Sequence, residues 1–510
     1  MAEEARRPLE PPFEETVSHL LLARAQEEPD RVLLVRSGEA VTLSQIALAA
    51  SAVATRLRDA GIAPGDPVLT MMDAGPNYVA HFFGIALAGA LWVPVSPEAK
   101  GPSLAHALSL AEPGLAFVAP SAVPALQAAG FPEGGRTVET DGWTTLAAEP
   151  GAVGDWQSFG MPDDKRAVLF TSGTSGPPKG VLVTDRMLLA SAAGCAMASD
   201  CEAGDGYLMW EPMHHVGGPQ LVIMALALGA KLVMVRRFSA TGFWPDVRRF
   251  DVTKLHYLGG ILEILLKSQV SKGDRTHPVK LAFGGGCRPE IGRAFEARFG
   301  IPIREVYGMT EASSFTTINM EGPLGSVGQA VPWLDVSIEN MDGAGAGEIV
   351  AAPRFPGLLT PGYLSNPQAT ERLLRNGALY SGDLGRRDGE GNFYFIGRQS
   401  DSFRRRGENI SAWEVETALS SHPDIAECAV VGVPSDIGEH DILCFLLLRD
   451  GCEFDPGGLV AWCRDALPRQ HVPRYWKRVA QFERTPSQRI RKDLLNRSLE
   501  GVFDAEKVIQ

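Results

Sequence analysis

The sequence predicts an α/β fold in which helix-covered, mostly parallel sheets are followed by a small antiparallel sheet or barrel and then by a small α+β domain. Three observations lead to this prediction. Ala- and Leu-rich segments with helical spacing alternate with short aliphatic runs through most of the chain, as expected when helices connect parallel strands. From about Val327 the pattern changes to short alternating strands separated by glycine turns. After Arg398 a separate order of helix, turn and strand begins.

The first helix-to-strand unit shows the pattern most clearly. Thr42 is a suitable N-cap for a helix whose apolar positions keep helical spacing up to Asp59. Gly61 and Pro64 end that helix, and the apolar run 68–71 is a predicted strand. Later units give a predicted helix at 78–90 and predicted strands at 91–95, 231–235 and 280–283. Helices of this kind are expected to cover both faces of the sheets.

The last part of the chain is organised differently. Residues 337–352 and 386–398 alternate around glycine turns, which predicts the antiparallel sheet or barrel. Residues 414–434 are a predicted helix, turn and strand, followed by a strand at 442–448 and a helix at 459–466. We therefore predict an N-terminal domain at 1–400 and a C-terminal domain at 401–510, with the boundary near Asp401.

The composition excludes several classes of protein. The 510 residues are 45% hydrophobic and 21% charged, which is typical of globular enzymes and not of disordered or coiled-coil chains. A net charge of −13 gives no general attraction for nucleic acid or anionic lipid, so no nucleic-acid partner is expected. The seven cysteines include no pair with the two-residue spacing of zinc or redox motifs, so reduced thiols are expected.

No segment predicts export or membrane insertion. Residues 1–15 contain acids and prolines where a signal peptide needs a basic patch and an apolar stretch. The most apolar segment, 221–235, is shorter than the roughly 20 residues of a membrane span and contains Gly229 and Lys231. We expect a cytoplasmic protein without a membrane span.

The segment 169–183, LFTSGTSGPPKGVLV, is the most informative part of the chain. Its glycines would let backbone N–H groups approach a polyphosphate, its hydroxyls would donate further hydrogen bonds, and its lysine would add a positive charge. Pro178 and Gly180 flank Lys179 where a P-loop NTPase needs Gly and Ser or Thr, which excludes that class. A solvated Ser/Gly turn has the same composition, and the loop alone fits the two interpretations about equally.

TSGTSGPPKG resembles the phosphate-binding motif of the adenylate-forming superfamily, which contains acyl- and aryl-CoA synthetases, luciferases and nonribosomal adenylation domains. Other family motifs follow in the family's order: an acyl-pocket gate at 212–218, a glycine loop at 284–286, Y-G-x-T-E at 307–311, a ribose-binding segment at 381–383, and the hinge region at 397–401 and 407–414. The resemblance covers Thr42 to Lys492. It implies an acyl-CoA ligase with two helix-covered, mostly parallel sheets and a small β-barrel in its N-terminal domain, and with a mobile C-terminal domain.

The resemblance also implies which residues activate a carboxylic acid with ATP. Thr310 would contact the α-phosphate, and Glu311 would hold Mg²⁺, a hard cation that prefers oxygen ligands. The β- and γ-phosphates would be held by Lys179 and by the loop residues Thr171, Ser172, Gly173, Thr174, Ser175 and Gly176.

The nucleoside and the acyl group would be held by the remaining motifs. Tyr307, followed by Gly308, would stack on adenine, and Asp383 would bind the ribose hydroxyls with Arg398 nearby. His215 would gate the acyl pocket beside Gly284, Gly285 and Gly286. In isolation such residues have structural explanations, because an Asp in a Ser-Gly-Asp turn is usually a cap and a His-His pair is usually a surface or structural feature.

The second half-reaction transfers the acyl group from the adenylate to a thiol, and AMP leaves. The resemblance implies that the C-terminal domain rotates at Asp401 for this step and that Gly407 lies where a side chain would block the pantetheine channel of coenzyme A. Arg404, Arg405 and Arg406 form a basic run suited to the CoA phosphates, although a solvated charged loop explains the run equally well. Because no carrier domain is recognised in the sequence, free CoA is favoured over a carrier-protein thiol.

The last motif of the chain departs from the family pattern. Family members usually end with P-x-T-x-S-G-K, whose lysine reaches the substrate carboxylate and the α-phosphate. Here residues 483–492 are ERTPSQRIRK, which places Gln488 at the glycine and Arg489 at the lysine. A guanidinium is larger than an ammonium and planar, so the exchange is not conservative. Loss of an aligned charge from a transition state costs on the order of 3 kcal/mol.

Three hypotheses follow. In the favoured one, Arg489 impairs adenylation, and the enzyme makes acyl-CoA from preformed acyl-adenylate supplied by a separate adenylating enzyme. In the second, Arg489 or nearby Lys492 replaces the lysine, and the protein is an ordinary two-step ATP-dependent acyl-CoA synthetase. In the third, the fold is a non-catalytic acyl-adenylate-binding protein. The acyl group is not identified, but small residues permit a bulky or hydrophobic acid in a pocket with the predicted walls His215, Val216, Gly217, Gly260, Gly284, Met309 and Ala312.

Overall fold

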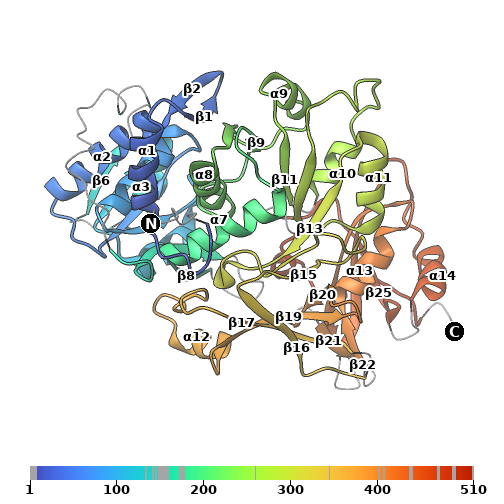
Figure 1. Ribbon diagram of the computed structural model, residues 1–510. Coiled ribbons are helices and arrows are strands. Elements are labelled where there is room, and N and C mark those ends of the chain that lie inside the picture. The colour runs from blue at the N-terminus through green and yellow to red at the C-terminus, as the bar shows by residue number, and fades with distance from the viewer. Residues whose placement is uncertain are drawn as a thin grey trace. The chain divides into compact units, whose positions relative to one another are not determined.

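The computed structural model describes residues 9–131, 135–139, 143, 146, 160–171, 178–258, 260–343, 345–399, 402–405, 408–435, 440–467, 471–484 and 490–507 (Figure 1). The chain forms two compact units. The first comprises Met1–Gly173, Pro177–Val336 and Ala351–Leu379, and the second comprises Thr174–Gly176, Ser337–Val350 and Tyr380–Gln510. Asp401 lies outside the described residues, and the domain boundary near it stays a prediction.

The first unit contains a six-stranded sheet in the order β6-β5-β3-β4-β7-β8. The strands β3 to β7 that pair in this sheet are parallel, and β8 is antiparallel to β7. The strands are β3 (Pro67–Met71), β4 (Leu91–Pro94), β5 (Leu115–Val118), β6 (Arg136–Glu139), β7 (Lys165–Thr171) and β8 (Lys179–Thr184). The helices between them are α3 (Pro76–Leu87), α4 (Gly101–Ala111) and α5 (Val123–Ala128).

Helix α2 (Leu43–Asp59) begins at the predicted N-cap. The Thr42 hydroxyl accepts a hydrogen bond from the Gln45 N–H (3.4 Å), and the Gln45 side chain accepts one from the Thr42 N–H (2.9 Å). These two bonds satisfy backbone donors that the first turn of a helix leaves free. The local signal at Thr42 was therefore sufficient to place this helix.

The first unit also contains a nine-stranded sheet in the order β15-β14-β13-β12-β11-β9-β10-β1-β2. Its central strands are parallel, and β2, β14 and β15 are antiparallel to their neighbours. The strands are β1 (Val32–Arg36), β2 (Glu39–Thr42), β9 (Gly206–Met209), β10 (Lys231–Met234), β11 (Lys254–Leu258), β12 (Leu281–Gly285), β13 (Ile303–Tyr307), β14 (Thr317–Ile318) and β15 (Gln329–Ala330).

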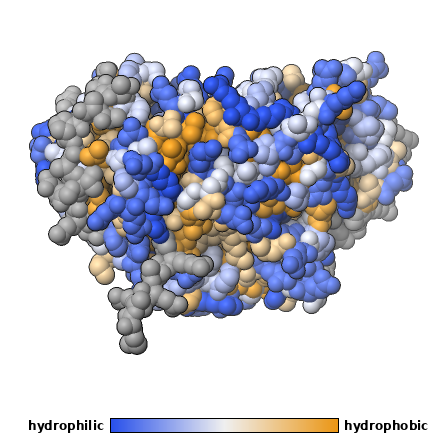
Figure 2. All heavy atoms as spheres, turned by 45° about the horizontal axis from the view of Figure 1, so that its top comes forward, coloured by the Kyte–Doolittle hydropathy of each residue, from blue (hydrophilic) through white to orange (hydrophobic). Residues whose placement is uncertain are grey.

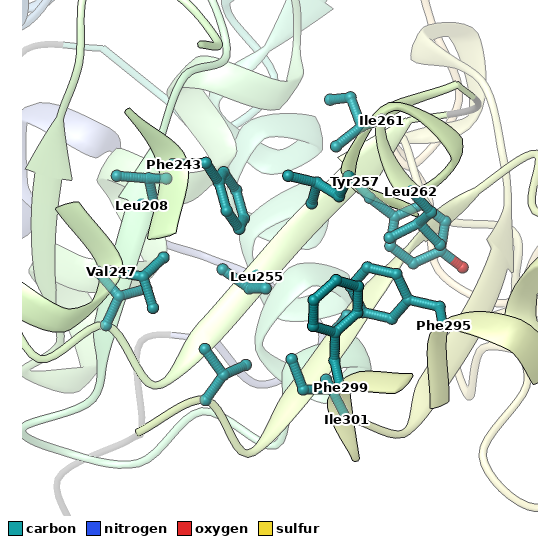
Figure 3. Packing of buried hydrophobic residues seen from close by; sticks show 14 of the residues in the cluster. Leu208, Phe243, Val247, Leu255, Tyr257, Ile261, Leu262, Phe295, Phe299 and Ile301 are labelled. Carbon is teal, nitrogen blue, oxygen red and sulfur yellow. The ribbon is translucent and has the colours of Figure 1, made fainter. Parts of the chain in front are cut away.

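One face of the nine-stranded sheet is covered by α9 (Phe243–Arg249), α10 (Ile261–Leu266) and α11 (Pro289–Phe299). Leu255 and Tyr257 of β11 point into this layer and pack with Phe295 and Phe299 of α11 (Figure 3). Because successive side chains of a strand face opposite ways, His256 faces the other side, where its ring lies 5.0 Å from that of Phe283. Helices α1 (Val17–Glu27), α7 (Asp185–Ser199) and α8 (Gly217–Leu228) complete the layers of this unit. The predicted pair of helix-covered, mostly parallel sheets is confirmed.

A five-stranded sheet follows, in which β16 (Leu334–Glu339), β17 (Gly347–Pro353), β19 (Ala378–Arg387) and β18 (Leu374–Arg375) are neighbours in that order. Strand β20 (Phe393–Arg398) pairs antiparallel with β19. Asn366 caps the helix α12 (Pro367–Leu373), because its side chain accepts a hydrogen bond from the Ala369 N–H (3.0 Å). This sheet corresponds to the small antiparallel sheet or barrel predicted from the glycine turns.

The second unit ends in an α+β region. The hairpin β21 (Ser402–Arg405) and β22 (Glu408–Ser411) leads into α13 (Ala412–Ser420). A four-stranded sheet then follows, made of β23 (Ile425–Pro434), β24 (His440–Leu448), β25 (Tyr475–Arg478) and β26 (Phe503–Asp504), with α14 (Pro456–Ala466) between β24 and β25. The predicted helices and strands of this region are present.

Arg405, the middle residue of the basic run, is buried with 4% of its surface exposed. Its guanidinium donates to Asp441 (3.0 Å) and to the Val472 carbonyl (2.9 Å), and Asp441 also pairs with Arg474 (2.8 Å). The hairpin is thereby fastened to β24 of the four-stranded sheet. Arg405 is thus a structural ion-pair residue, and neither the solvated loop nor a free phosphate contact describes it.

The surface is mainly hydrophilic on the face shown in Figure 2, with hydrophobic side chains in separate patches. The exposed large apolar residues come from separate segments, such as Val270 and Met341. Among the described helices, none combines the length and the hydropathy that crossing a bilayer would require.

Candidate active site

Three of the predicted motifs leave the nine-stranded sheet at the same edge. The neighbouring parallel strands β9, β11, β12 and β13 end at Met209, Leu258, Gly285 and Tyr307. The acyl-gate segment follows β9, the glycine loop follows β12, and the Y-G-M-T-E motif follows β13. Because the carboxyl edge of a parallel sheet is where such folds bind ligands, the strand order itself gathers these motifs into one candidate site.

The phosphate-loop segment connects the antiparallel strands β7 and β8 of the other sheet. Thr171 at the end of β7 is paired with Lys179 at the start of β8, and the Lys179 side chain is exposed. At the exit of the loop, the His106 ring is hydrogen-bonded to the Pro178 carbonyl (3.0 Å). Ser172, Gly173, Thr174, Ser175 and Gly176 lie outside the described residues, so their phosphate contacts stay predictions.

The Y-G-M-T-E motif forms a tight turn after β13. Tyr307 is 9% exposed, and a Cβ atom on Gly308 would lie only 1.7 Å from the Ser314 carbonyl oxygen, so a side chain at this position cannot fit. The Thr316 N–H donates to the Tyr307 carbonyl (2.9 Å), which closes the turn. The turn places Thr310 and Glu311 in a short 3-10 helix, Thr310–Ala312.

Glu311 is 6% exposed and is held by a segment far along the chain. Its side chain accepts a hydrogen bond from the Tyr363 hydroxyl (2.8 Å), and its backbone carbonyl accepts one from the Thr360 N–H (2.8 Å). The Lys179 ammonium lies 4.9 Å from the centroid of the Tyr363 ring. The structure therefore brings Lys179 and Glu311 together around Tyr363. Tyr363 is not among the site residues predicted from the sequence, because residues 360–363 carry the local signal of a turn.

The glycine loop begins where β12 packs most closely on β11. A Cβ atom on Gly284 would lie 1.9 Å from the Tyr257 carbonyl oxygen, which makes glycine necessary there. Gly285 ends β12, and Gly286 adopts a left-handed conformation with φ of 85°. Behind the loop, the buried Glu305 side chain accepts a hydrogen bond from the Cys287 N–H. Burial raises the pKa of Glu305 to about 8.

This raised pKa predicts a pH-dependent stability. Between the ordinary pKa of a glutamate and pH 8, the folded chain holds a proton at Glu305 that the unfolded chain has released, so stability falls as pH rises through this window. From pH 6 to pH 8, we expect the free energy of unfolding to fall by about 2 kcal/mol more in the parent chain than in the Glu305→Gln variant. Urea unfolding at several pH values measures this difference. Parallel pH profiles for the two chains would contradict the prediction.

The acyl-gate segment is anchored by a buried acid and a histidine. Glu211, 2% exposed, is hydrogen-bonded to Nδ1 of His256, 8% exposed, on β11. The Trp210 indole donates to the His256 carbonyl (3.0 Å). These contacts tie the segment after β9 to the neighbouring strand. Neither Glu211 nor His256 is predicted from the sequence, because neither lies in a motif identified there.

The gate segment contains two adjacent histidines, of which only His215 is a predicted site residue. The ring centroids of His214 and His215 are 4.6 Å apart, and the His215 N–H donates to the Pro212 carbonyl (3.1 Å). Burial, with a further contribution from His215, lowers the pKa of His214 to about 3, so this imidazole is neutral near pH 7. The gate thus presents at least one uncharged imidazole beside the predicted acyl-pocket residue His215.

In the second unit the structure brings Asp383 and Arg398 together, as predicted. They face each other across β19 and β20, and the Arg398 guanidinium lies 3.3 Å from the Asp383 carboxylate. Asp383 is 4% exposed, and its N–H donates to the Ser381 hydroxyl (3.0 Å). The Gly382 N–H donates to Glu348 (2.9 Å), which fixes the turn before the aspartate.

Gly407, Gln488, Arg489 and the Arg404 side chain lie outside the described residues. The described neighbours of Arg489 are informative, because Arg484 and Ile490 form an antiparallel bridge across residues 485–489. Lys492 pairs with Glu416 (2.8 Å), and the same Glu416 oxygen accepts the Val430 N–H (2.6 Å). Lys492 is therefore engaged in an ion pair within its own unit.

The chain matches two sequence families. Residues 21–364 match the family described as AMP-binding enzyme, and residues 414–489 match the AMP-binding enzyme C-terminal domain. Among curated proteins, the chain is 30% identical to a sulfoacetate–CoA ligase of Cupriavidus necator, over 96% of this chain and 99% of that protein. It is also 30% identical to an oxalate–CoA ligase of Arabidopsis thaliana, over 94% and 98% of the two chains.

Solved structures share the fold. The O-succinylbenzoate coenzyme A synthetase of Bacillus subtilis in complex with AMP superimposes with a TM-score of 0.83 at 23% identity, over 95% of this chain and 99% of that one. ATP-bound MatB of Rhodopseudomonas palustris gives a TM-score of 0.85 at 21% identity, over 94% and 98%. The family match over the greater part of the sequence agrees with the motif order and with the gathering of those motifs at one sheet edge. The chain belongs to the adenylate-forming superfamily of AMP-binding enzymes, in its acyl-CoA ligase branch.

Proposed function

We propose that the chain is a complete two-step acyl-CoA ligase. It forms an acyl-adenylate from a carboxylic acid and ATP with release of pyrophosphate, and then transfers the acyl group to the thiol of coenzyme A with release of AMP. The observation that carries the proposal is the meeting of Lys179 and Glu311 around Tyr363. The Lys179 ammonium suits the triphosphate, and the Glu311 carboxylate suits a divalent cation.

The residues present fit Mg²⁺ bound together with a nucleotide. Mg²⁺ in such enzymes is typically held by one or two carboxylates plus substrate phosphates. Glu311 supplies a carboxylate, and the described part of the chain has no group of three or more His, Cys, Asp or Glu side chains arranged to hold a metal without substrate. Mg²⁺ offsets phosphate charge when it is bound. We assign the contact with the α-phosphate to Thr310.

The nucleoside and acyl roles follow from the positions of the other residues. Tyr307 ends β13 at the sheet edge, where its ring would stack on adenine, and the buried Asp383 beside Arg398 would accept bonds from the ribose hydroxyls. The gate at His215 and the loop at 284–286 would border the acyl group. The CoA ligases among the relatives support a thiol acceptor of the CoA type.

The proposal favours the complete reaction over the thioester-only hypothesis drawn from Arg489. The two curated relatives described above are named as CoA ligases, and the phosphate side of the site retains both Lys179 and Glu311. Lys492 would have to leave Glu416 in order to serve as the missing lysine. We therefore assign the charge that reaches the substrate carboxylate to Arg489.

The test measures the two half-reactions separately and distinguishes the role of Arg489 from that of Lys492. ATP with a panel of acids that includes sulfoacetate and oxalate is scored for pyrophosphate, and synthetic acyl-adenylate with CoA is scored for thioester. We expect the parent chain to perform both reactions, Arg489→Met to lose about 100-fold in pyrophosphate release, and Lys492→Met to change it by less than about twofold. Arg489→Lys should retain pyrophosphate release.

Other outcomes would identify the competing functions. Thioester formation without pyrophosphate release in the parent chain would mean an enzyme of the second step alone. Nucleotide binding with neither reaction would mean a non-catalytic acyl-adenylate-binding protein. A loss of pyrophosphate release in Lys492→Met, with Arg489→Met unaffected, would transfer the proposed role to Lys492.

A further inference from the structure

We infer that Tyr363 is a positioning residue for the first half-reaction, which holds Glu311 for the metal and Lys179 for the phosphates at the same time. This inference rests on the proposed function. None of the motifs identified in the sequence above includes Tyr363, and it lies 52 residues from Glu311 along the chain. Its role emerges from two contacts, one made by the hydroxyl and one made by the ring.

The hydroxyl contact orients the carboxylate without neutralising it. The Tyr363 O–H donates to Oε1 of Glu311 at 2.8 Å, within the usual range for a hydrogen bond between oxygens. A lysine or arginine in the same place would supply a positive charge and compete with a divalent cation for the carboxylate. A phenol is a neutral donor, so this contact adds no positive charge that would compete with Mg²⁺ for the carboxylate.

The ring contact orients the Lys179 ammonium without neutralising it. The Lys179 ammonium lies 4.9 Å from the ring centroid, within the range over which an aromatic face attracts a positive charge. An exposed lysine has many rotamers, and this attraction favours those that stay over the ring. Because the ring is neutral, the full charge of Lys179 remains for the phosphates. Tyr363 therefore places one cation and one anion without neutralising either.

The backbone explains why Tyr363 stays in place. Its segment lies alongside β8, which begins with Lys179: Tyr363 forms an antiparallel bridge with Val181, and the Leu364 N–H donates to the Gly180 carbonyl (2.7 Å). The Leu182 N–H donates to the Gly362 carbonyl (3.0 Å). These bonds do not involve the tyrosine side chain. A Tyr363→Phe variant should therefore keep the ring where it is and remove only the hydroxyl contact.

The experiment uses the full-length protein and measures ATP binding by calorimetry, with Mg²⁺ and with EDTA in its place. We expect Tyr363→Phe to weaken ATP binding about 10-fold in Mg²⁺ and to leave binding in EDTA unchanged, because only the carboxylate loses its anchor. Tyr363→Leu, which also removes the ring, should weaken binding in EDTA as well. Tyr394→Phe is the matched control, since it removes a tyrosine hydroxyl that bonds Asp388 at 3.0 Å.

A kinetic arm distinguishes positioning from a general structural role. Pyrophosphate release by Tyr363→Phe should fall about 10- to 100-fold and recover in part at high Mg²⁺, while thioester formation from synthetic acyl-adenylate stays at the parent rate. Equal losses in both half-reactions, or unchanged ATP affinity in Mg²⁺, would overturn the inference. If the parent chain binds ATP in Mg²⁺ but makes no adenylate, the proposed function fails and calorimetry alone decides on Tyr363. If the parent chain binds no ATP, both proposals are overturned.

Discussion

The Glu311→Gln variant is expected to release pyrophosphate about 100- to 1,000-fold more slowly than the parent chain. Glutamine has nearly the same shape as glutamate, and its amide oxygen can still accept the Tyr363 hydroxyl hydrogen bond seen at 2.8 Å. What the variant loses is the negative charge that would hold the divalent cation. Pyrophosphate release from ATP and acid at saturating Mg²⁺ measures this loss.

Two controls make this result specific. Asp335→Asn removes an exposed carboxylate of β16 that pairs with Arg354 (2.8 Å), and it should leave the rate within about twofold. Thioester formation from synthetic acyl-adenylate should also be near the parent rate in Glu311→Gln, because no phosphate is transferred in that step. Pyrophosphate release within a few-fold of the parent in Glu311→Gln would remove Glu311 from the proposed metal site.

The Asp185→Ala variant is expected to lose about 3–5 kcal/mol of unfolding free energy. Asp185 is fully buried, and its carboxylate accepts hydrogen bonds from the Arg166 guanidinium (2.8 Å) and the Val17 N–H (2.9 Å). Arg166 is 1% exposed, so truncation of the aspartate leaves a buried guanidinium without its counter-charge. Urea unfolding followed by tryptophan fluorescence measures the change.

A neighbouring pair supplies the matched comparison. Asp163 binds Arg186 at 2.7 Å, but 56% of the Asp163 side chain is exposed. Solvent screens that pair, so Asp163→Ala should cost no more than about 1 kcal/mol. The double variant Arg166→Met with Asp185→Leu should recover much of the loss, because two apolar side chains leave no charge unpaired. Equal effects of Asp185→Ala and Asp163→Ala would refute the explanation by burial.

The features that the sequence predicted correctly are those with a local signal. The N-cap at Thr42 depends on residues three positions apart, and the glycines at 284 and 308 occur where the backbone leaves no room for a Cβ atom. The pairing of Asp383 with Arg398 also follows from one short hairpin. Motif order then supplied the family, and strand order supplied the common edge at which several motifs meet.

The features that the sequence analysis missed depend on contacts between distant segments. Tyr363 and Glu311 are 52 residues apart, and Glu211 and His256 are 45 apart. Spacing within a motif carries no information about such pairs. Arg405 illustrates the same limit in a charged run, since composition does not indicate that this side chain turns inward to Asp441, 36 residues away.

The bridge between Arg484 and Ile490 has a consequence for protein engineering. It makes the five intervening residues an exchangeable cassette, whose ends are joined to each other by backbone bonds rather than by the substituted side chains. Gly and Lys at positions 488 and 489 would therefore restore the Ser-Gly-Lys end of the usual family motif without changing Lys492 or Glu416. Other cationic residues could be placed at position 489 in the same way. A series of such variants would show which side-chain geometry the adenylation step requires.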